Sequence, residues 1–374
     1  MMNFDFGDVA RSGCFLVLNV ALDNLELYGY DINVPDKHSN CLLHYSAQHG
    51  NTETTLKLLT LKALPDVVNA RRQTPLHLAC IHQHKPIIKI LADSNAKMNI
   101  KDHLGQTPLF YLANSPSLAE FLIAQGADIN ISNSIGETLL HVAVKAGKKT
   151  LVQYFLEHGL YVDAKTACGD TPLMFAVQRG FAKIVHILLE HGADYKIENH
   201  KSQNLLHLAV ENQQNEVCER LLSMEINFDQ LDRDGASPLH LAAQRNYCDI
   251  IRILAESNVK IDQRDFDNYT PLHVAASNKN NGYAVAVLLE QHASIDAVTC
   301  NGDLPLHKAA GSGNEKAVKL LYRKAFLSVK NRCGLTPLMM AEAHDRRSVV
   351  YLLKELEVRQ KLRRTSAIPV KRAI

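Results

Sequence analysis

The sequence of 374 residues contains no tryptophan, and aromatic residues make up only 6% of it. Its eight cysteines include no CxxC pair and no short spacing suited to a zinc site. The cysteine pattern therefore does not indicate a disulfide-stabilised secreted domain or a cysteine-ligated metal centre. We expect free thiols, and a location in the reducing environment of the cytoplasm or the nucleus.

Long apolar runs are also missing. The longest early run, from Cys14 to Leu22, is interrupted by Asn19 and is too short to span a bilayer. It follows Asp5 and Asp8 instead of a basic segment, which argues against a signal peptide. We therefore expect no transmembrane segment.

The charges are nearly balanced, with 41 Lys and Arg residues against 39 Asp and Glu residues and a formal net charge of +2. This balance gives no general attraction to nucleic acid or to an anionic membrane. The tail from Val358 to Ile374 is an exception, because it contains six basic residues and no acidic one. We expect nucleic-acid binding only through this tail.

One four-residue pattern recurs ten times along the chain. Its fullest form is Thr-Pro-Leu-His, and leucine holds the third position in every copy. The copies begin at Cys41, Thr74, Thr107, Thr138, Thr171, Asn204, Ser237, Thr270, Leu304 and Thr336. The step from one copy to the next is 31 to 34 residues. A period of about 33 residues with this signature resembles the ankyrin repeat, and the likeness covers nearly the whole chain.

The resemblance implies an all-α solenoid of stacked antiparallel helix pairs with β-hairpin-like turns, in which each repeat contacts only its neighbours. We interpret residues 1–36 as a degenerate N-terminal capping repeat and residues 37–356 as ten repeats. Residues 357–374 form the basic tail, which we expect to extend the last helix by about one turn and to be disordered beyond it.

The residue types agree with this interpretation. Threonine before the pattern's proline is a good N-cap, and proline suits the first helical position. Glycine in the turn column, as at Gly105, suits a backbone with positive φ. Arg72 and Ser202 occupy this column in two repeats and leave the local turn shape open. The 31-residue step predicts a shortened connection at residues 114–117.

The histidines at the end of the pattern share one repeat column: His44, His77, His141, His207, His240, His273 and His307. A histidine there can form a hydrogen bond across the loop between neighbouring repeats, so we interpret this column as structural. No Ser or Cys nucleophile with a nearby base stands apart from the repeat columns. We therefore predict no enzyme, no catalytic residue, no metal, no cofactor and no small-molecule substrate.

Stacked repeats align their turn tips and first helices into one concave face, where the residue types are free to vary. Phe266 and Tyr269 are aromatic at tips where the fold does not demand it, and aromatic residues and arginine are enriched at binding hot spots. The predicted partner-binding residues are Arg179, Lys201, Arg233, Arg245, Phe266 and Tyr269. The alternative is that the tips tolerate any soluble residue.

These observations favour a monomeric, non-enzymatic scaffold that binds one or more proteins on its concave face. The alternative is an adaptor, or an effector delivered to a host cell, whose array holds a client while the basic tail directs localisation. Ser366 follows two arginines in a segment that resembles a basophilic kinase motif. Asn33 and Asn130 resemble the asparagines that are hydroxylated in ankyrin repeats.

Overall fold

The computed structural model describes residues 5–24, 30–224, 226–279, 282–322 and 327–366, with side chains as far as Arg359. Within these ranges the chain forms helices joined by turns and contains no β-strand, so the predicted all-α fold is confirmed. The chain divides into two compact units. The N-terminal unit is Met1–Ala176 with Lys183–Ala193, and the C-terminal unit is Val177–Ala182 with Asp194–Ile374.

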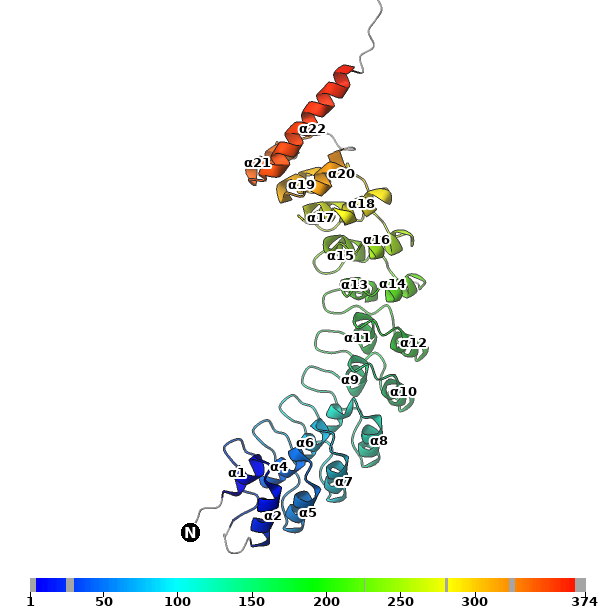
Figure 1. Ribbon diagram of the computed structural model, residues 1–374. Coiled ribbons are helices and arrows are strands. Elements are labelled where there is room, and N and C mark those ends of the chain that lie inside the picture. Colours follow the sequence, from blue (N-terminus) through cyan, green and yellow to red (C-terminus); the bar gives the residue numbers. More distant parts are fainter. Residues whose placement is uncertain (1–4, 25–29, 225, 280–281, 323–326, 367–374) are drawn as a thin grey trace, which may run out of the picture. The chain divides into compact units, whose positions relative to one another are not determined.

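In the N-terminal unit, each repeat has a turn, a first helix and a second helix (Figure 1). The first helices are α1 Phe6–Arg11, α4 Leu42–His49, α6 Pro75–Ile81, the 3-10 helix η1 Pro108–Leu112, α9 Leu139–Lys145 and α11 Pro172–Gln178. The second helices are α2 Phe15–Asp23, α5 Thr52–Thr60, α7 Lys85–Asp93, α8 Pro116–Ala124, α10 Lys149–Glu157 and α12 Ala182–Glu190. The end of α11 and the first residue of α12 fall within Val177–Ala182, which is assigned to the C-terminal unit. First helices pack on first helices, as α4 does on α6, and second helices pack on second helices, as α5 does on α7.

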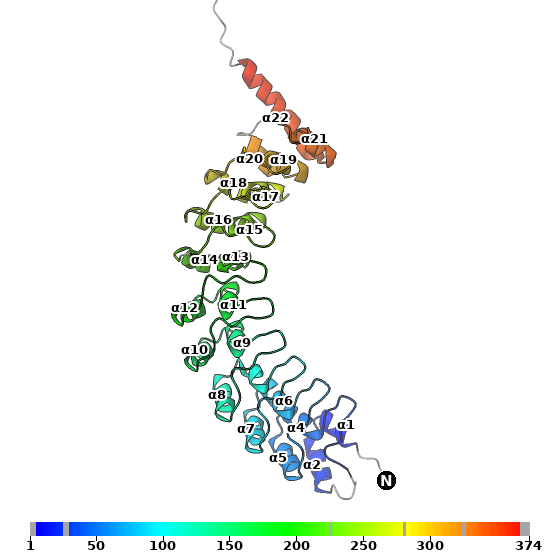
Figure 2. The ribbon, with the colours of Figure 1, turned by 180° about the vertical axis from the view of Figure 1, so that it is seen from behind.

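The C-terminal unit repeats the same arrangement. Its first helices are α13 Leu205–Glu211, α15 Pro238–Arg245, α17 Pro271–Ser277, α19 Pro305–Ser312 and α21 Pro337–Ala343. Its second helices are α14 Asn215–Leu222, α16 Cys248–Ala255, α18 Tyr283–Glu290, α20 Glu315–Tyr322 and α22 Arg347–Ser366. Figure 2 shows the turns on the side of the first helices. The apolar core lies between the two helix layers, where Leu239, Ile251 and Leu254 are fully buried.

Each copy of the four-residue pattern begins a first helix. The backbone N–H of the N-cap Thr74 donates to Nδ1 of His77 at 3.0 Å. The other ring nitrogen, Nε2, lies 3.2 Å from the carbonyl oxygen of Gln106 in the next repeat. Because a carbonyl only accepts hydrogen bonds, Nε2 carries the ring proton and donates it. The histidine therefore fixes its own helix start and the following turn.

The other six histidines of this column make the same contact with the next repeat, at 3.0 to 3.3 Å, so their predicted structural role is confirmed. Burial lowers the pKa of all seven imidazoles. It lowers the pKa to about 4 for His44, His141 and His273. These rings are therefore neutral at physiological pH.

Four repeats lack glycine in the turn column and still keep the shape of the turn, because Ser39, Arg72, Ser202 and Asn268 all have positive φ. Arg72 and Ser202 have φ values of 57° and 56°, close to the 72° of Gly105. A non-glycine residue in this left-handed region is strained, because Cβ approaches the backbone. The tips therefore have one backbone shape, which the four tips without glycine adopt at an energetic cost.

The repeat that begins at Thr107 is irregular. Its first helix is the five-residue 3-10 helix η1, and α8 already begins at Pro116. The predicted short connection is thus present, and it shortens the first helix. Phe110 stands at the position that is histidine in seven of the ten repeats. The hydroxyl of Thr107, a residue only 1% exposed, has no hydrogen-bond partner among the described residues. In the two other repeats without this histidine, the hydroxyls of Thr171 and Thr336 accept the backbone N–H groups of Met174 and Met339.

The C-terminus differs from the sequence-based expectation. Helix α22 continues to Ser366, so the segment after Glu357 that was expected to be disordered beyond about one turn is helical to that residue. The sequence from Val358 to Ser366 has no Gly or Pro and is rich in good helix formers. Arg359 also pairs with Glu355 one turn earlier, at 2.6 Å. Residues 367–374 lie outside the described residues.

The first 36 residues contribute α1 and α2, which pack on each other and on α4 and α5. The outward side of α2 is apolar, since Leu16 and Val20 are 82% and 65% exposed. The sequence-based interpretation of a capping repeat did not anticipate this exposed face, because a cap is expected to present polar residues to water.

Candidate partner-binding surface

Ten turn tips project from the first helices, and each is anchored by one short polar side chain. These anchors are Asp36, Asn69, Asp102, Asn133, Thr166, Asn199, Asp232, Asp265, Thr299 and Asn331. In nine tips the side-chain oxygen of the anchor accepts hydrogen bonds from the backbone N–H groups two and four residues later in the chain. In the remaining tip, Thr299 accepts the N–H four residues later. Sequence reasoning missed this column, although it recurs five residues before each N-cap.

Neighbouring tips are also joined through their backbones. In the N-terminal unit the N–H of Ala70 donates to the carbonyl oxygen of His38 at 3.0 Å. The N–H of His103 donates to the carbonyl oxygen of Arg71, also at 3.0 Å. In the C-terminal unit the N–H of Arg233 donates to the carbonyl of Lys201 at 2.8 Å. The residues at successive tips are therefore held side by side within each unit.

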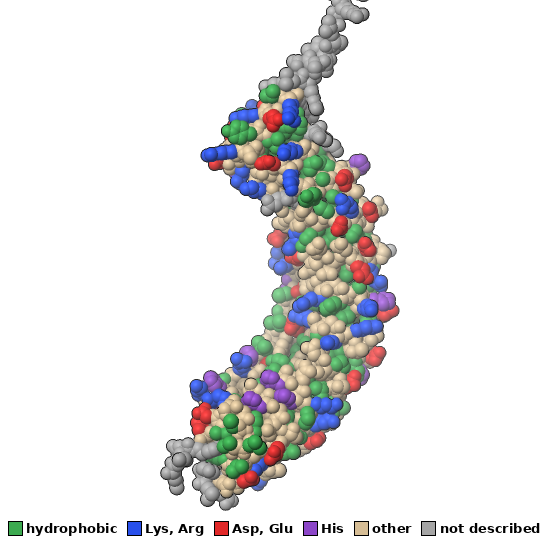
Figure 3. Space-filling view, in the orientation of Figure 1, with side chains coloured by type: hydrophobic (Ala, Val, Ile, Leu, Met, Phe, Trp, Pro, Cys, Tyr) green, Lys and Arg blue, Asp and Glu red, His purple; other side chains and the backbone are tan. Residues whose placement is uncertain are grey.

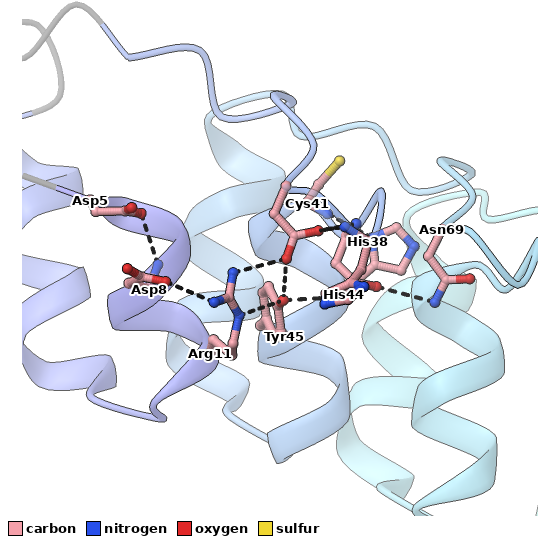
Figure 4. Close-up of polar contacts among 10 residues, drawn as sticks. Asp5, Asp8, Arg11, His38, Cys41, His44, Tyr45 and Asn69 are labelled. Atoms are coloured by element: carbon pink, nitrogen blue, oxygen red, sulfur yellow. Dashed lines mark hydrogen bonds and ion pairs between the residues drawn. The ribbon is translucent and has the colours of Figure 1, made fainter.

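The first tip shows how the anchors are fixed (Figure 4). Asp36 accepts the hydroxyl proton of Tyr45 at 2.5 Å and a guanidinium N–H of Arg11 at 3.1 Å, besides the N–H groups of His38 and Asn40. Burial favours the neutral acid, but these hydrogen bonds outweigh it and lower the pKa of Asp36 to about 2. The carboxylate thus has a structural role, and Arg11 links α1 to the tip.

Three of the predicted partner-binding residues lie together at successive tips of the C-terminal unit. Lys201 and Arg233 are exposed, and their tips are joined by the backbone bond described above. Phe266 is 67% exposed, and its ring covers Gly235, where an added Cβ would lie 2.7 Å from the ring. We call these three residues the tip cluster. Its aromatic ring is held in place by packing and still faces solvent.

The other three predicted residues lie on the side of the first helices. The ring of Tyr269 is half-buried below Nζ of Lys308, which is 4.6 Å from the ring centre, and it borders a hollow of about 310 Å³. Arg245 at the end of α15 pairs with Glu211 of α13 at 3.2 Å. Arg179 is exposed just after α11. The six residues therefore divide into the tip cluster and separate helix-side positions.

The predicted modification sites differ in their surroundings. The side-chain oxygen of Asn33 accepts the backbone N–H of Leu64 in the next repeat at 2.9 Å. The carboxylate of Asp66 accepts the backbone N–H of Lys97 in the same way, at 2.8 Å. Asn130 is exposed in a turn. Ser366 is the last residue of α22, and its side chain lies outside the described residues.

No group of three or more His, Cys, Asp and Glu side chains in the described part of the chain is arranged to hold a metal ion. Among the helices described, none is long and apolar enough to cross a membrane.

Comparison with known families gives matches along most of the chain. Residues 18–102, 43–133, 109–199, 206–299 and 272–363 each match the family model for ankyrin repeats in three copies. These ranges leave only the two ends and a few residues between 199 and 206 unmatched.

Several curated proteins are similar over shorter stretches. An ankyrin repeat-containing protein of Schizosaccharomyces pombe is 34% identical over 92 residues, which is 24% of this chain and 44% of that protein. The B-cell lymphoma 3 protein homolog of Mus musculus is 32% identical over 122 residues, or 30% of this chain and 27% of the relative. An ankyrin repeat protein of fowlpox virus is 29% identical over 134 residues, which is 35% of this chain and 30% of that protein. The chain thus spans less than half the length of each of these relatives.

Proposed function

The chain belongs to the ankyrin-repeat family, and on that premise we propose that it is a non-enzymatic scaffold that binds a partner protein through the tips and first helices of its C-terminal unit. The observation that carries this proposal is the tip cluster. Phe266 exposes two thirds of its surface while its ring packs on Gly235, beside the tips of Arg233 and Lys201.

Pre-organisation supports the proposal. Each tip of the cluster is bonded to its own anchor, namely Asn199, Asp232 or Asp265, so its backbone is ordered before a partner arrives. A surface that is already ordered loses little conformational entropy on binding. Aromatic and arginine side chains then provide contact area and directed hydrogen bonds, which is why they dominate many interfaces.

Replacing the tip cluster tests the proposal. In the triple variant Lys201→Ala, Arg233→Ala and Phe266→Ala, recovery of the bound protein from cell extract should fall by about tenfold or more. Recovery is measured by affinity purification and mass spectrometry with the full chain. Tyr269 and Arg245 are less suitable for replacement, because their side chains contact Lys308 and Glu211 within the protein.

A matched control is available on the second helices. Tyr283 of α18 is 64% exposed, and Nζ of Lys316 in α20 lies 5.1 Å from its ring centre. The double variant Tyr283→Ala and Lys316→Ala removes an aromatic residue and a cation from the opposite helix layer, and it should retain the partner. If the tip-cluster variant retains every partner that the wild type binds, the proposed surface is wrong.

The adaptor role remains the second candidate function, and the long α22 favours it. The helix carries basic residues past the last repeat. Deletion of residues 358–374 should change the location of the protein in cells and leave its partners unchanged. An unchanged location would favour the scaffold alone.

A further inference from the structure

Three successive tips of the N-terminal unit carry basic and imidazole side chains and no carboxylate at their outermost positions. These positions hold Lys37 and His38, Ala70 and Arg71, and His103 and Leu104. The carboxylates of Asp36 and Asp102 lie below the first and third of these tips. Each already accepts two backbone N–H groups and a tyrosine hydroxyl. Asp36 is also paired with Arg11, and Asp102 is only 4% exposed, so the exposed charges at this edge are those of Lys37 and Arg71.

A hollow of about 410 Å³ lies between the first two of these tips and the helices α4 and α6. Leu78 and Ile81 of α6 form its floor, and His38, Arg71 and His82 stand around it. The other polar lining consists of the side-chain amides of Asn40, Gln48, Asn69 and Gln73. None of the lining residues is acidic, and Arg71 forms no ion pair with a carboxylate of the described residues.

The histidine on the α6 side of the hollow is held in place before any ligand arrives. The ring of His82 stacks on that of His84, with centroids 5.9 Å apart and planes inclined by 18°. Nε2 of His84 in turn lies 3.0 Å from the carbonyl oxygen of Gln48, to which it donates a hydrogen bond. In Figure 3 histidine side chains gather over α4 and α6 on this face.

We propose that this hollow binds an extended acidic segment of a partner protein. One aliphatic side chain of the segment lies against Leu78 and Ile81, and its carboxylates meet Arg71 and His82. The side-chain amide of Gln48 hydrogen-bonds to the backbone of the segment, whereas Asn40, Asn69 and Gln73 bond to one another. The proposal rests on the protein-binding role argued above, but it concerns the N-terminal unit and a partner of stated chemistry, whereas the tip cluster belongs to the C-terminal unit.

The lining favours an acidic peptide over a nucleic acid. Nucleic-acid binding depends on many Lys and Arg side chains that neutralise successive phosphates. Here Arg71 is the only Lys or Arg among the lining residues, and the floor is aliphatic. Arginine forms paired hydrogen bonds with a carboxylate, and an aliphatic floor of this size suits one side chain of a peptide.

The test uses random peptides displayed on phage and selected on the full chain. We expect the selected sequences to share acidic residues next to an aliphatic one. The double variant Lys37→Glu and Arg71→Glu reverses two exposed charges at the tips, and it should bind the selected peptide at least about tenfold more weakly in fluorescence polarisation. Its thermal unfolding, followed by circular dichroism, should match that of the wild type because both side chains are exposed.

Two controls make the outcome specific. Lys85→Glu with Lys149→Glu changes the charge by the same amount at exposed positions of α7 and α10, and it should bind the peptide like the wild type. The tip-cluster variant should also bind it, so this proposal and the one for the C-terminal unit can fail independently. The proposal is overturned if the selection yields no acidic sequences, if the reversed variant binds equally well, or if oligothymidylate displaces the peptide at a similar concentration.

Discussion

Thr107 and Thr74 occupy the same N-cap position in successive repeats and are both about 1% exposed, but their hydroxyls have different surroundings. The hydroxyl of Thr74 lies 2.9 Å from Nδ1 of His77. The hydroxyl of Thr107 has no histidine partner, because Phe110 stands there, and it does not accept the backbone N–H that satisfies Thr171 and Thr336 in the repeats with methionine. A buried hydroxyl without a partner loses its hydrogen bonds to water and gains none in exchange.

Replacement of each threonine by the isosteric valine should therefore have opposite results. Thr74→Val should destabilise the protein by about 1 kcal/mol, because it removes a cap and a bond to His77. Thr107→Val should be neutral or stabilise by up to about 1 kcal/mol, because it removes an unsatisfied group. Urea unfolding midpoints measure both effects. Equal destabilisation by the two changes would show that the Thr107 hydroxyl is satisfied in solution.

At the scale of elements, the turn tips, first helices and second helices follow local rules that the sequence displays. The repeated N-cap, proline and leucine predicted the position of every first helix from α4 onward, including the short one after Thr107. The length of α22 was missed because the repeat pattern ends before the helix does. Helix propensity alone, from Val358 onward, would have extended the prediction.

The candidate site was less predictable from the sequence. Phe266 and Arg233 were recognised as tip residues, but the packing of Phe266 on Gly235 joins positions one repeat apart and has no local signature. The same holds for the pair of Arg245 and Glu211. The hollow beside Arg71 was not anticipated, because its floor and its edges come from different repeats.

The strained turn tips lead to a prediction about stability. Arg72 has a φ of 57°, so Arg72→Gly should relieve the strain in the folded state. Glycine also increases the conformational entropy of the unfolded chain, and the net stabilisation should be about 0.5–1 kcal/mol. Gly334 has a φ of 77° and no atom within 4 Å of an added Cβ, so Gly334→Ala should cost about 1 kcal/mol through the backbone alone. Thermal midpoints of the two variants should move in opposite directions. A lower midpoint for Arg72→Gly would contradict the argument.

At the scale of the whole molecule, seven buried histidines tie stability to pH. Their pKa values in the folded state are lowered below 6.5, to about 4 for three of them, so the unfolded chain binds more protons between these values. Stability is therefore complete above pH 6.5 and falls as the pH drops toward 4. At pH 5.5 each of the three histidines with a pKa of about 4 should lower the free energy of unfolding by about 1 kcal/mol.

Urea unfolding at pH 7.5, 6.5 and 5.5 would measure this dependence. His273→Gln should make the dependence on pH less steep, because it removes one of the seven imidazoles, the fully buried ring that donates to the backbone carbonyl of Asp303. His38→Gln changes an exposed ring and should leave the slope as in the wild type. A slope that His273→Gln does not alter would exclude this histidine as a source of the pH dependence.

The anchor below each tip has an evolutionary consequence. Because a residue such as Asn69 fixes the loop from inside, the pair of residues beyond it, here Ala70 and Arg71, contributes little to folding. Mutations at such pairs can accumulate without loss of the scaffold, and selection can act on each pair separately. A new binding preference can therefore arise by small, independent changes, in nature or in a designed library.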